Sequence, residues 1–387
     1  MDLAGPGRSL RSTLRTPAAR VRWRCDVAIV GGGPAGLACA VEAGRRGLSA
    51  VVLERRAMPC DKACGEGLMP AGVRAVERLG VRELLSPEDA WPFVGIRYVQ
   101  EDGSSAEGRL PGGGGLGVRR IALVSALSQR ARGLGAQLVD RVEVRRHLRT
   151  SRGVWIATSD GPCEARVLVA ADGLSSEMRH AEGLDVPSRG PRRFGMRRHF
   201  RVAPWSPFVE VHFAEDAEAY VAPVGGGRVG IAFLWDAARL APPVSFAALL
   251  GRFPALAERL AGAEPDSGVR GAGPLARGAR ALVKDRFVLL GDAAGYVDAI
   301  TGEGLSLSLS AAETLGEILP DALARGATAE SLRPYEEACR RRYRRYSWLA
   351  RALVAISGRP ALRRAVIHSL GRHPRVFDRI LAAVAAR

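Results

Sequence analysis

The apolar positions near the start of the chain fall into short runs that are interrupted by glycine. The segments DVAIVG, residues 26–31, and AVVLE, residues 50–54, are almost wholly apolar and have the length of buried parallel strands. Between them, residues 35–46 carry closely spaced Ala, Leu, Cys and Val, and Gly47 follows as a helix stop. The pattern predicts one β–α–β unit in this part of the chain.

A different pattern of apolar and polar positions interrupts these buried strands further along the chain. Between residues 192 and 235, four alternating runs separated by turn residues predict an antiparallel sheet. Buried strands of the first kind return on either side of it, at 166–170 (RVLVA) and 286–290 (RFVLL). The sheet is therefore an insert. Helical spacing of apolar residues predicts helices at 69–85, 121–134 and 246–260.

The elements predict an α/β protein, α+β overall, that combines a Rossmann-like dinucleotide-binding domain with an inserted antiparallel-sheet domain and a C-terminal helical stretch. The first 24 residues hold six arginines and no apolar core of a secretory signal, so we expect a disordered extension there or a start codon assigned too far upstream. The expected boundaries are 25–85, 108–190 and 270–330 for the dinucleotide-binding domain, 86–107 and 191–269 for the insert, which we expect to hold the substrate, and 331–387 for the helical stretch.

The basic charge of the chain does not indicate a nucleic-acid partner. The formal net charge is +17, but acidic residues are interleaved almost throughout, so the charge is diffuse. Every basic residue except Lys62 and Lys284 is arginine, as a coding sequence rich in G and C would give. We interpret most of this charge as a solvated surface. Weaker interpretations of the charge are binding to an anionic membrane surface, binding of an acidic substrate and, last, binding of nucleic acid.

Six cysteines show no disulfide-framework spacing, which favours a reducing, cytoplasmic compartment. No run of about 18 apolar residues occurs, so no membrane-spanning helix is expected.

The first candidate site is the pattern Gly31-x-Gly33-x-x-Gly36 between the first strand and the first helix. Gly31 permits a tight turn, Gly33 allows the backbone to approach a pyrophosphate, and Gly36 allows close packing of helix on strand. Glu54 ends the second strand and can accept hydrogen bonds from a ribose 2′-hydroxyl, which favours FAD or NAD over NADP here. The residues assigned to this site are Gly31, Gly33, Pro34, Ala35, Gly36, Glu54 and Arg55.

Two further motifs follow buried strands. In VLVAADGLSSEMR, residues 167–179, the strand runs into Asp172-Gly173. In the stretch 286–315, a strand ends at Gly291-Asp292. The Asp292 carboxylate can accept hydrogen bonds from the hydroxyls of a ribityl chain.

The stretch 286–315 then places Gly302-x-Gly304 before a helix. Backbone amides between Gly302 and Leu305 would lie at the helix N-terminus, where a partial positive charge favours a reduced flavin at its pyrimidine edge.

The order and spacing of these motifs resemble the FAD-dependent oxidoreductase superfamily of p-hydroxybenzoate hydroxylase-like (group A) flavin monooxygenases and geranylgeranyl reductases. The resemblance covers residues 26–319 and implies that FAD is the cofactor. It places Asp172-Gly173 near the flavin pyrophosphate, with a link to the nicotinamide cofactor, and Gly291-Asp292 on the ribityl chain. The segment VRRIALVSAL is similar to a family pattern in which an arginine, here Arg120, reaches the FAD phosphates or ribose.

A smaller resemblance concerns the branch of the superfamily. The segment 59–80 contains Lys-x-Cys-Gly at 62–65, similar to the geranylgeranyl reductases, in which it lies against the flavin and the substrate cavity. Cys64 is therefore a candidate cavity residue. With Cys60 it could form half of a metal site or a redox disulfide, but no second ligand pair completes a metal site and we assign none. Ala299 stands where a proline usually sits beside the flavin ring.

The insert segment 219–235 is similar to the sheet segment that faces the flavin in this superfamily. Tyr220, Pro223 and Trp235 are candidate residues of the substrate pocket or aromatic and apolar core residues. His199 and His212 are interpreted as satisfied sheet residues rather than catalysts. No catalytic residue is assigned, because the cofactor carries the chemistry.

Two functions stay open at this point. The first is an NAD(P)H-dependent monooxygenase that hydroxylates or epoxidises an apolar or aromatic small molecule of secondary metabolism. The second is a C=C reductase or dehydrogenase of the geranylgeranyl reductase type, acting on an isoprenoid or a polyketide. NAD(P)H is expected as electron donor in either case. It would bind transiently, because no second glycine fingerprint is present.

The stretch from Arg340 to the C-terminus is basic and amphipathic, with Trp348, Leu349, Leu353 and Ile356 among arginines at helical spacing. A core-packed final helix and a helix adsorbed on an anionic bilayer are both compatible with this pattern. The second interpretation would add a peripheral membrane contact to a cytoplasmic enzyme with an apolar substrate.

Overall fold

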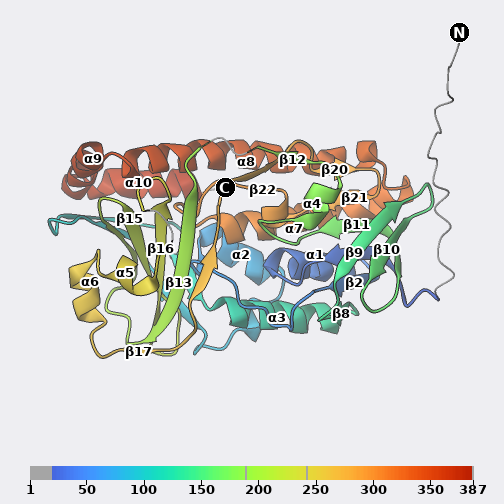
Figure 1. Ribbon diagram of the computed structural model, residues 1–387, viewed down its shortest axis with the longest axis horizontal. Coiled ribbons are helices and arrows are strands. Elements are labelled where there is room, and N and C mark those ends of the chain that lie inside the picture. Colours follow the sequence, from blue (N-terminus) through green and yellow to red (C-terminus); the bar gives the residue numbers. More distant parts are fainter. Residues whose placement is uncertain (1–19, 188–189, 241–242, 386–387) are drawn as a thin grey trace, which may run out of the picture.

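The computed structural model describes residues 20–187, 190–240 and 243–385 and shows two lobes joined along one side by a long helix (Figure 1). One lobe is an α/β unit, and the other is a sheet with short helices whose strands are antiparallel except for the parallel pair of residues 95–99 and 208–213. The disordered extension was expected over residues 1–24, of which residues 1–19 lie outside the described part of the chain. Trp23 and Arg24, which were assigned to that extension, are the first residues of strand β1.

The α/β lobe is built on an eight-stranded sheet whose central strand is β1, Trp23–Val30. It pairs in parallel with β2, Ala50–Leu53, on one side and with β11, Cys163–Ala170, on the other. Because the chain leaves β1 for β2 and returns beyond β1 for β11, a crevice opens at the carboxyl ends of β1 and β11, where such sheets bind ligands. The sheet also contains β8 Gln137–Val139, β9 Val144–Arg149, β10 Val154–Thr158, β20 Val283–Lys284 and β21 Phe287–Leu289.

Three helices cover one face of this sheet: α1, Pro34–Gly44, α3, Arg120–Gly133, and α7, Gly304–Ala324. They bury a continuous apolar core that includes Leu37, Leu123 and Leu309. The hairpin β9–β10, which the sequence analysis did not predict, covers part of the other face. A small three-stranded sheet consists of β12 Asp185–Val186, β19 Arg277–Ala279 and β22 Gly295–Tyr296, and the short helix α4 spans Glu177–Ala181.

The second lobe confirms the predicted insert. Its sheet runs in the order β17-β13-β16-β15-β14-β5-β6. The segments 95–109 and 193–265 therefore meet in one sheet. The bounds are β5 Gly95–Val99, β6 Ser105–Arg109, β13 Arg193–Arg201, β14 Phe208–Phe213, β15 Ala217–Pro223, β16 Arg228–Asp236 and β17 Glu264–Pro265, with β18 Arg270–Ala272 paired to β13.

Several helices are shorter than the sequence pattern predicted. The helix expected at 246–260 is split into α5, Phe246–Leu250, and α6, Pro254–Arg259, because Pro254 starts a new helix. The helix expected at 69–85 ends early as α2, Pro70–Arg78, since Gly80 has a positive φ of 65°. A short 3-10 helix follows at Arg82–Leu84, another lies at Gly291–Ala293, and β3 Gly67–Leu68, β4 Ala90–Phe93 and β7 Gly115–Val118 form a small sheet beside α2.

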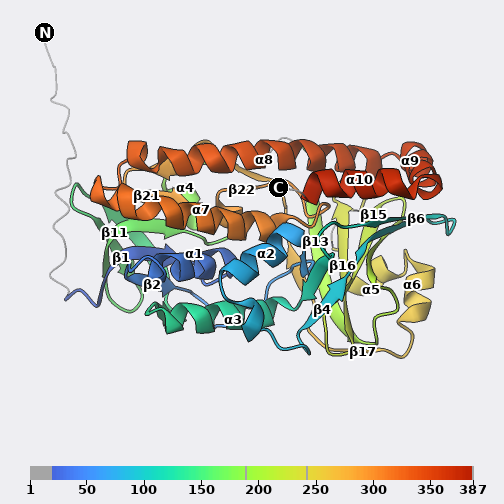
Figure 2. The ribbon, with the colours of Figure 1, turned by 180° about the vertical axis from the view of Figure 1, so that it is seen from behind.

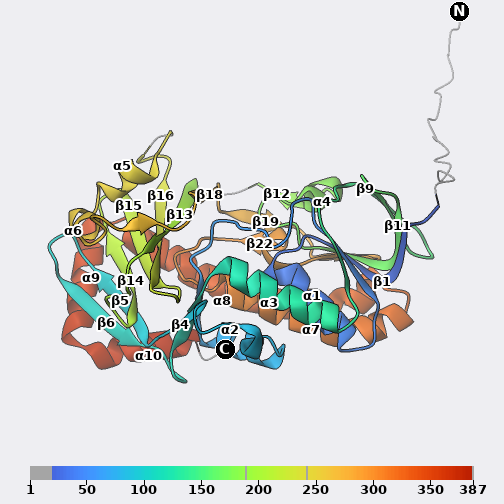
Figure 3. The same cartoon turned by 90° about the horizontal axis from the view of Figure 1, so that it is seen from below.

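The C-terminal stretch is helical, as predicted, and belongs to both lobes. Helix α8, Ala329–Ser357, runs along α7 and continues toward the sheet lobe (Figure 2). Helices α9, Pro360–Arg372, and α10, Pro374–Ala385, then pack against β6 (Figure 3). Ile367, Phe377 and Leu381 are buried there. Within the described residues, no helix has both the length and the apolar character that a bilayer span requires.

Candidate functional site

The glycine loop after β1 has the geometry that a phosphate-binding turn requires. Gly31 has φ of 112°, and a Cβ there would lie 2.3 Å from the Ala171 carbonyl oxygen. A Cβ on Gly36 would lie 2.0 Å from the Gly31 carbonyl oxygen. Any side chain at these positions would therefore push α1 away from β1 and β11. Gly33 caps α1, and Pro34 and Ala35 open the helix, so the free amides of its first turn face the crevice.

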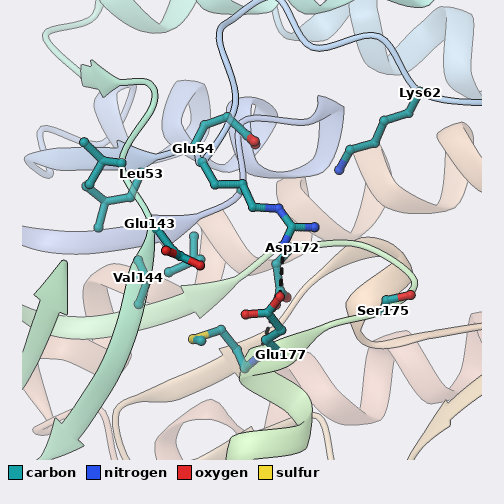
Figure 4. Close-up of a pocket in the computed structure, with 13 residues that line it drawn as sticks. Leu53, Glu54, Lys62, Glu143, Val144, Asp172, Ser175 and Glu177 are labelled. Carbon is teal, nitrogen blue, oxygen red and sulfur yellow. Dashed lines mark hydrogen bonds and ion pairs between the residues drawn. The ribbon is translucent and has the colours of Figure 1, made fainter. Parts of the chain in front are cut away.

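Glu54, directly after β2, holds this loop in place through hydrogen bonds. Its carboxylate is 4% exposed and accepts hydrogen bonds from the backbone N–H groups of Gly32, at 2.8 Å, and Arg56, at 3.0 Å. A pocket opens beside it, between the ends of β2 and β11 (Figure 4). Its rim carries an exposed ion pair between Arg55 and Glu177, at 2.9 Å. The remaining lining includes the apolar side chains of Val30, Leu53, Val142, Val144 and Met178. A carboxylate beside an apolar slot suits the ribose and adenine of a dinucleotide.

Asp172 shapes the loop after β11. Its carboxylate accepts hydrogen bonds from the Ser176 hydroxyl, at 2.6 Å, and from the Met178 backbone N–H, at 3.1 Å. Both bonds hold the start of α4. Gly173 turns the chain with φ of 86°. Asp172 therefore lines the crevice, but both its oxygens accept hydrogen bonds from the protein, and its role near the FAD pyrophosphate stays a prediction.

Arg179 is a site residue that the sequence analysis did not assign, although it ends the motif containing Asp172. It is 3% exposed, and its guanidinium donates to the carbonyl oxygens of Leu174, at 2.9 Å, and Ala293, at 3.0 Å. Its Nε donates to Asp185 at 2.6 Å. Arg179 thus ties the loop after β11 to the loop after β21.

Gly291 and Asp292 lie at the end of β21, against α1. Gly291 has φ of 64°, and a Cβ there would lie 2.8 Å from the Ala35 Cβ. Among the described residues, the Asp292 carboxylate has no hydrogen-bond donor. Burial raises the pKa of Asp292, and the positive charges of Arg120 and Lys62 oppose this rise. An unpartnered carboxylate between two cations can accept hydrogen bonds from the hydroxyls of a ribityl chain.

The start of α7 lies beyond Asp292. Gly302 turns the chain with φ of 69°, and the N–H groups of Gly304 and Leu305 lie in the first helical turn, where no intrahelical acceptor exists. A Cβ on Gly304 would lie 3.1 Å from the Tyr296 ring, so the glycine lets the chain pass close to that ring. These amides are therefore free to donate, and their role at the pyrimidine edge of a flavin stays a prediction.

Arg120 is the first residue of α3, and its guanidinium reaches the glycine loop. Its Nη2 lies 3.4 Å from the position of a Cβ on Gly33, and its buried Nε has no hydrogen-bond partner within the described part of the chain. The neighbouring Arg119 instead pairs with Asp266 at 3.0 Å. Of the two adjacent arginines, Arg120 is therefore the one that is free to bind a phosphate. The glycine loop, Arg120 and Asp292 together fit an FAD molecule.

A buried polar cluster joins this site to the insert. Glu66, 2% exposed, accepts a hydrogen bond from the Arg120 backbone N–H at 2.8 Å and pairs with His199 Nε2. His199 Nδ1 lies 2.9 Å from the Ser267 hydroxyl. Arg197, fully buried, contacts Asp61 at 2.5 Å. His199 is thus bonded on both ring nitrogens, as expected for a satisfied sheet residue.

Cys64 lies in the loop between Asp61 and Glu66. Its Sγ accepts a hydrogen bond from the Glu66 backbone N–H at 3.4 Å, and burial raises the pKa of its thiol. All six cysteines are free, and the described residues contain no cluster of three or more metal-binding side chains. Cys64 is therefore a neutral thiol in this loop, and its place in a substrate cavity stays a prediction; Cys60 is a buried free thiol.

The three candidate pocket residues of the insert do not share one face of the sheet. Trp235 pairs with Ala217 across β15 and β16, whereas Tyr220 lies three positions further along β15 and points to the opposite face. Trp235 stacks on Phe194, with ring centroids 5.9 Å apart, in the core beneath α5 and α6. Trp235 is therefore a core aromatic, the second of the two interpretations that the sequence allowed.

Tyr220 and Pro223 lie later in β15 than Ala217, the residue that pairs with Trp235. Tyr220 packs with Tyr98 and Val211 in the apolar cluster covered by α9 and α10. The Pro223 carbonyl approaches Gly117 of β7 so closely that a Cβ on Gly117 would lie 1.6 Å from it. The end of β15 therefore lies against the small sheet beside α2.

A second buried cluster connects the loop before α7, the insert and α8. Arg193 donates two hydrogen bonds to Glu218, at 3.1 and 2.8 Å, and its Nε lies 2.9 Å from Asp298 Oδ2. Tyr220 donates to Glu218 at 2.9 Å, and the Ser357 hydroxyl donates to the other oxygen of Glu218. Sequence reasoning missed this cluster, because its members are far apart in the chain and follow no spacing rule.

The fold and this site define an FAD-dependent oxidoreductase with a Rossmann-type domain and a sheet-lined insert. Residues 24–347 match a protein family described as "FAD binding domain", and the chain belongs to that family. The match spans both lobes and most of α8.

Similar proteins support this assignment. The chain is 30% identical over 334 residues to digeranylgeranylglycerophospholipid reductase 1 of Methanopyrus kandleri, covering 81% of this chain and 85% of that protein. It is 30% identical over 300 residues to dialkyldecalin synthase of Streptomyces rugosporus, covering 75% of this chain and 64% of that longer protein. The fold matches a flavoprotein/dehydrogenase from Cytophaga hutchinsonii with a TM-score of 0.81 and 19% identity, over 94% of this chain and 92% of that one.

Proposed function

We propose that this FAD-dependent oxidoreductase reduces a carbon–carbon double bond in an apolar substrate of the isoprenoid class. The observation that carries the proposal is the similarity to digeranylgeranylglycerophospholipid reductase 1, which covers 85% of that protein. Digeranylgeranyl lipids carry unsaturated isoprenoid chains. The chain also shares the Lys-x-Cys-Gly segment at 62–65 with that branch of the superfamily.

The geometry is compatible with this chemistry. When bound, FAD supplies hydride equivalents. The glycine loop, Arg120 and Asp292 would hold it, and the amides at the start of α7 would favour its reduced form. Cys64 lies near this site and remains a neutral thiol because burial raises its pKa.

The electron donor in this proposal is NAD(P)H. It would reduce the flavin transiently, since the glycine loop and Glu54 serve the adenosine half of FAD. The same glycine spacing recurs at 112–117 and 225–230, but these stretches lead into strands β7 and β16 rather than into a helix, so neither forms a second phosphate loop for a nicotinamide cofactor.

An anaerobic assay tests the proposal. The purified protein, reconstituted with FAD, is mixed with NADPH or NADH and a geranylgeranylated lipid, with and without oxygen, and the products are weighed by mass spectrometry. A product that gains two hydrogen atoms without oxygen supports reduction. A product that forms only with oxygen and gains one oxygen atom would replace the proposal with the monooxygenase function that the sequence alone placed first.

We further propose that α8 contacts an anionic membrane surface. Trp348 is 73% exposed. Arg341, Arg344, Arg345 and Arg351 are also exposed and follow the spacing that puts them on the same helix face as Trp348. Exposed arginines around a tryptophan suit adsorption to anionic headgroups. The opposite side of α8 packs on the protein, so both interpretations of the C-terminal stretch apply to different faces of one helix. The cytoplasmic location stays a prediction.

A further inference from the structure

Lys62 has a fixed backbone and a free ammonium group. The Lys62 carbonyl oxygen accepts a hydrogen bond, at 2.9 Å, from Arg197, which reaches it from β13 and is 1% exposed. The side chain is half-buried and lines the pocket beside Glu54, and its nitrogen end points toward that pocket (Figure 4). Within the described part of the chain, the Lys62 ammonium forms no hydrogen bond or ion pair.

Two of the acidic groups near Lys62, Asp61 and Asp172, are already engaged, and the third, Asp292, forms no ion pair with it among the described residues. Asp61 pairs with Arg197, at 2.5 Å, and with Arg270, at 3.3 Å. Asp172 accepts its two hydrogen bonds from the start of α4. The ammonium itself lies 3.8 Å from the position of a Cβ on Gly173, directly after β11. A partly buried cation without an ion-pair partner is costly, and Lys62 shares the more distant charge of Asp292 with Arg120, so an anionic ligand is its natural partner.

Arg120 occupies the matching position beside the neighbouring strand. Its guanidinium lies near Gly33, directly after β1, and its buried Nε is without a partner among the described residues. Both positive charges act on Asp292, which burial would otherwise drive further toward its neutral form. Two unpaired cations thus lie at the carboxyl ends of two adjacent parallel strands, one beside the glycine loop and one beside Gly173.

We infer that Lys62 and Arg120 together neutralise the two phosphate groups of the FAD diphosphate, and that Lys62 contributes to the preference for FAD over FMN. The diphosphate of FAD presents two phosphate groups, each with one negative charge, so that each cation can face one of them, whereas FMN has a single phosphate group. Charge-assisted hydrogen bonds to phosphate are the strongest polar contacts available to a lysine. The inference rests on FAD as the cofactor and adds a binding residue to it.

The scarcity of lysine makes this inference directly testable on the unaltered protein. The chain contains only Lys62 and Lys284. Lys284 donates to the Glu182 carboxylate at 2.9 Å, far along the chain from the glycine loop, and is the internal control. The apo-protein is labelled with an amine-reactive acetylating reagent, alone or with FAD, ADP or FMN, and each lysine is quantified by peptide mass spectrometry.

We expect FAD and ADP to protect Lys62 at least about 10-fold, FMN to protect it less, and Lys284 labelling to stay constant. Equal labelling of Lys62 with and without saturating FAD would overturn the inference. A protein that binds no FAD at all would instead refute the cofactor assignment, so the two failures are distinguishable.

A variant series gives the second readout. FAD binding is followed by quenching of flavin fluorescence. We expect K62M to raise the Kd for FAD about 10- to 100-fold, K62R to restore it to within about 3-fold, and K284M to leave it unchanged. We expect a smaller rise for FMN than for FAD. Unchanged FAD affinity in a folded K62M protein would contradict the inference, and if K62M does not fold, the labelling result decides.

Discussion

Asp298 gives a sharp test of the buried cluster that joins the loop before α7 to the insert. Burial raises the pKa of Asp298 to about 6, against 3.8 for an ordinary aspartate. Arg193 opposes this rise, but Glu218 adds to it. Burial also acts on Glu218, yet its two hydrogen bonds from Arg193 hold the pKa of Glu218 below its usual value. The Arg193 guanidinium therefore keeps Glu218 ionised. Asp298, the other carboxylate that contacts Arg193, binds a proton more readily than an ordinary aspartate does.

The pKa of Asp298 predicts how stability depends on pH. The folded protein binds the Asp298 proton more tightly than the unfolded chain does. This contribution to stability is therefore fully present below about pH 4 and is lost as the pH rises to about 6. Since one pKa unit corresponds to about 1.4 kcal/mol, the whole contribution is about 3 kcal/mol, of which about 2 kcal/mol falls between about pH 4.5 and pH 7.5.

The perturbation is D298N, which cannot ionise. Other carboxylates change the stability of both proteins in the same way, so the difference between wild type and variant isolates Asp298. We expect urea unfolding to show that D298N gains about 2 kcal/mol relative to wild type when the pH is raised from about 4.5 to about 7.5. Asp321 is 70% exposed, and D321N is the matched control, for which we expect no such gain. A wild-type-minus-D298N difference that does not vary with pH would refute this account of the cluster.

Three further predictions concern the cofactor site and α8. We expect R120M to raise the Kd for FAD about 10-fold or more, because the Arg120 guanidinium forms no ion pair with another described residue; unchanged quenching of flavin fluorescence on titration would contradict this. We expect G36A to lower the free energy of unfolding by about 2 kcal/mol or more and to abolish FAD binding, since its Cβ would lie 2.0 Å from the Gly31 oxygen; a stable G36A flavoprotein would show that the loop can relax. We expect wild type to sediment with vesicles containing phosphatidylglycerol, and a variant carrying W348S, R344S and R345S to stay in the supernatant; equal sedimentation of both would remove the membrane contact.

The parts of the fold that follow from local patterning were predictable. Strand β2 and the last four residues of β1 and of β11 are wholly apolar, and each strand leads into a loop that holds a candidate binding residue. The alternating runs at 192–235 gave the insert, because each strand buries one face. Hairpin β9–β10 was missed: only part of its sequence, such as Val154 and Ile156, alternates clearly, and arginines dominate β9.

The candidate site was predictable where one motif carries one role, as with Gly31, Gly36 and Asp292. It was not predictable where the role depends on contacts between distant segments. The sequence could not tell that Asp172 uses both oxygens on α4, or that Trp235 and Tyr220 lie on opposite faces. Nor could it show that Arg197, from the insert, fixes the backbone of Lys62. Such contacts are set by tertiary packing, for which no residue spacing is diagnostic.

The central claim is that the loops after β1, β11 and β21, with Arg120, hold one FAD. The most direct measurement is to release the chromophore from the purified protein with heat or acid, to identify it by mass spectrometry, and to titrate the resulting apo-protein with FAD. We predict FAD as the released flavin and saturation at about one FAD per chain, with ADP competing and FMN competing more weakly. A folded protein that yields no flavin and quenches no added FAD would contradict the claim.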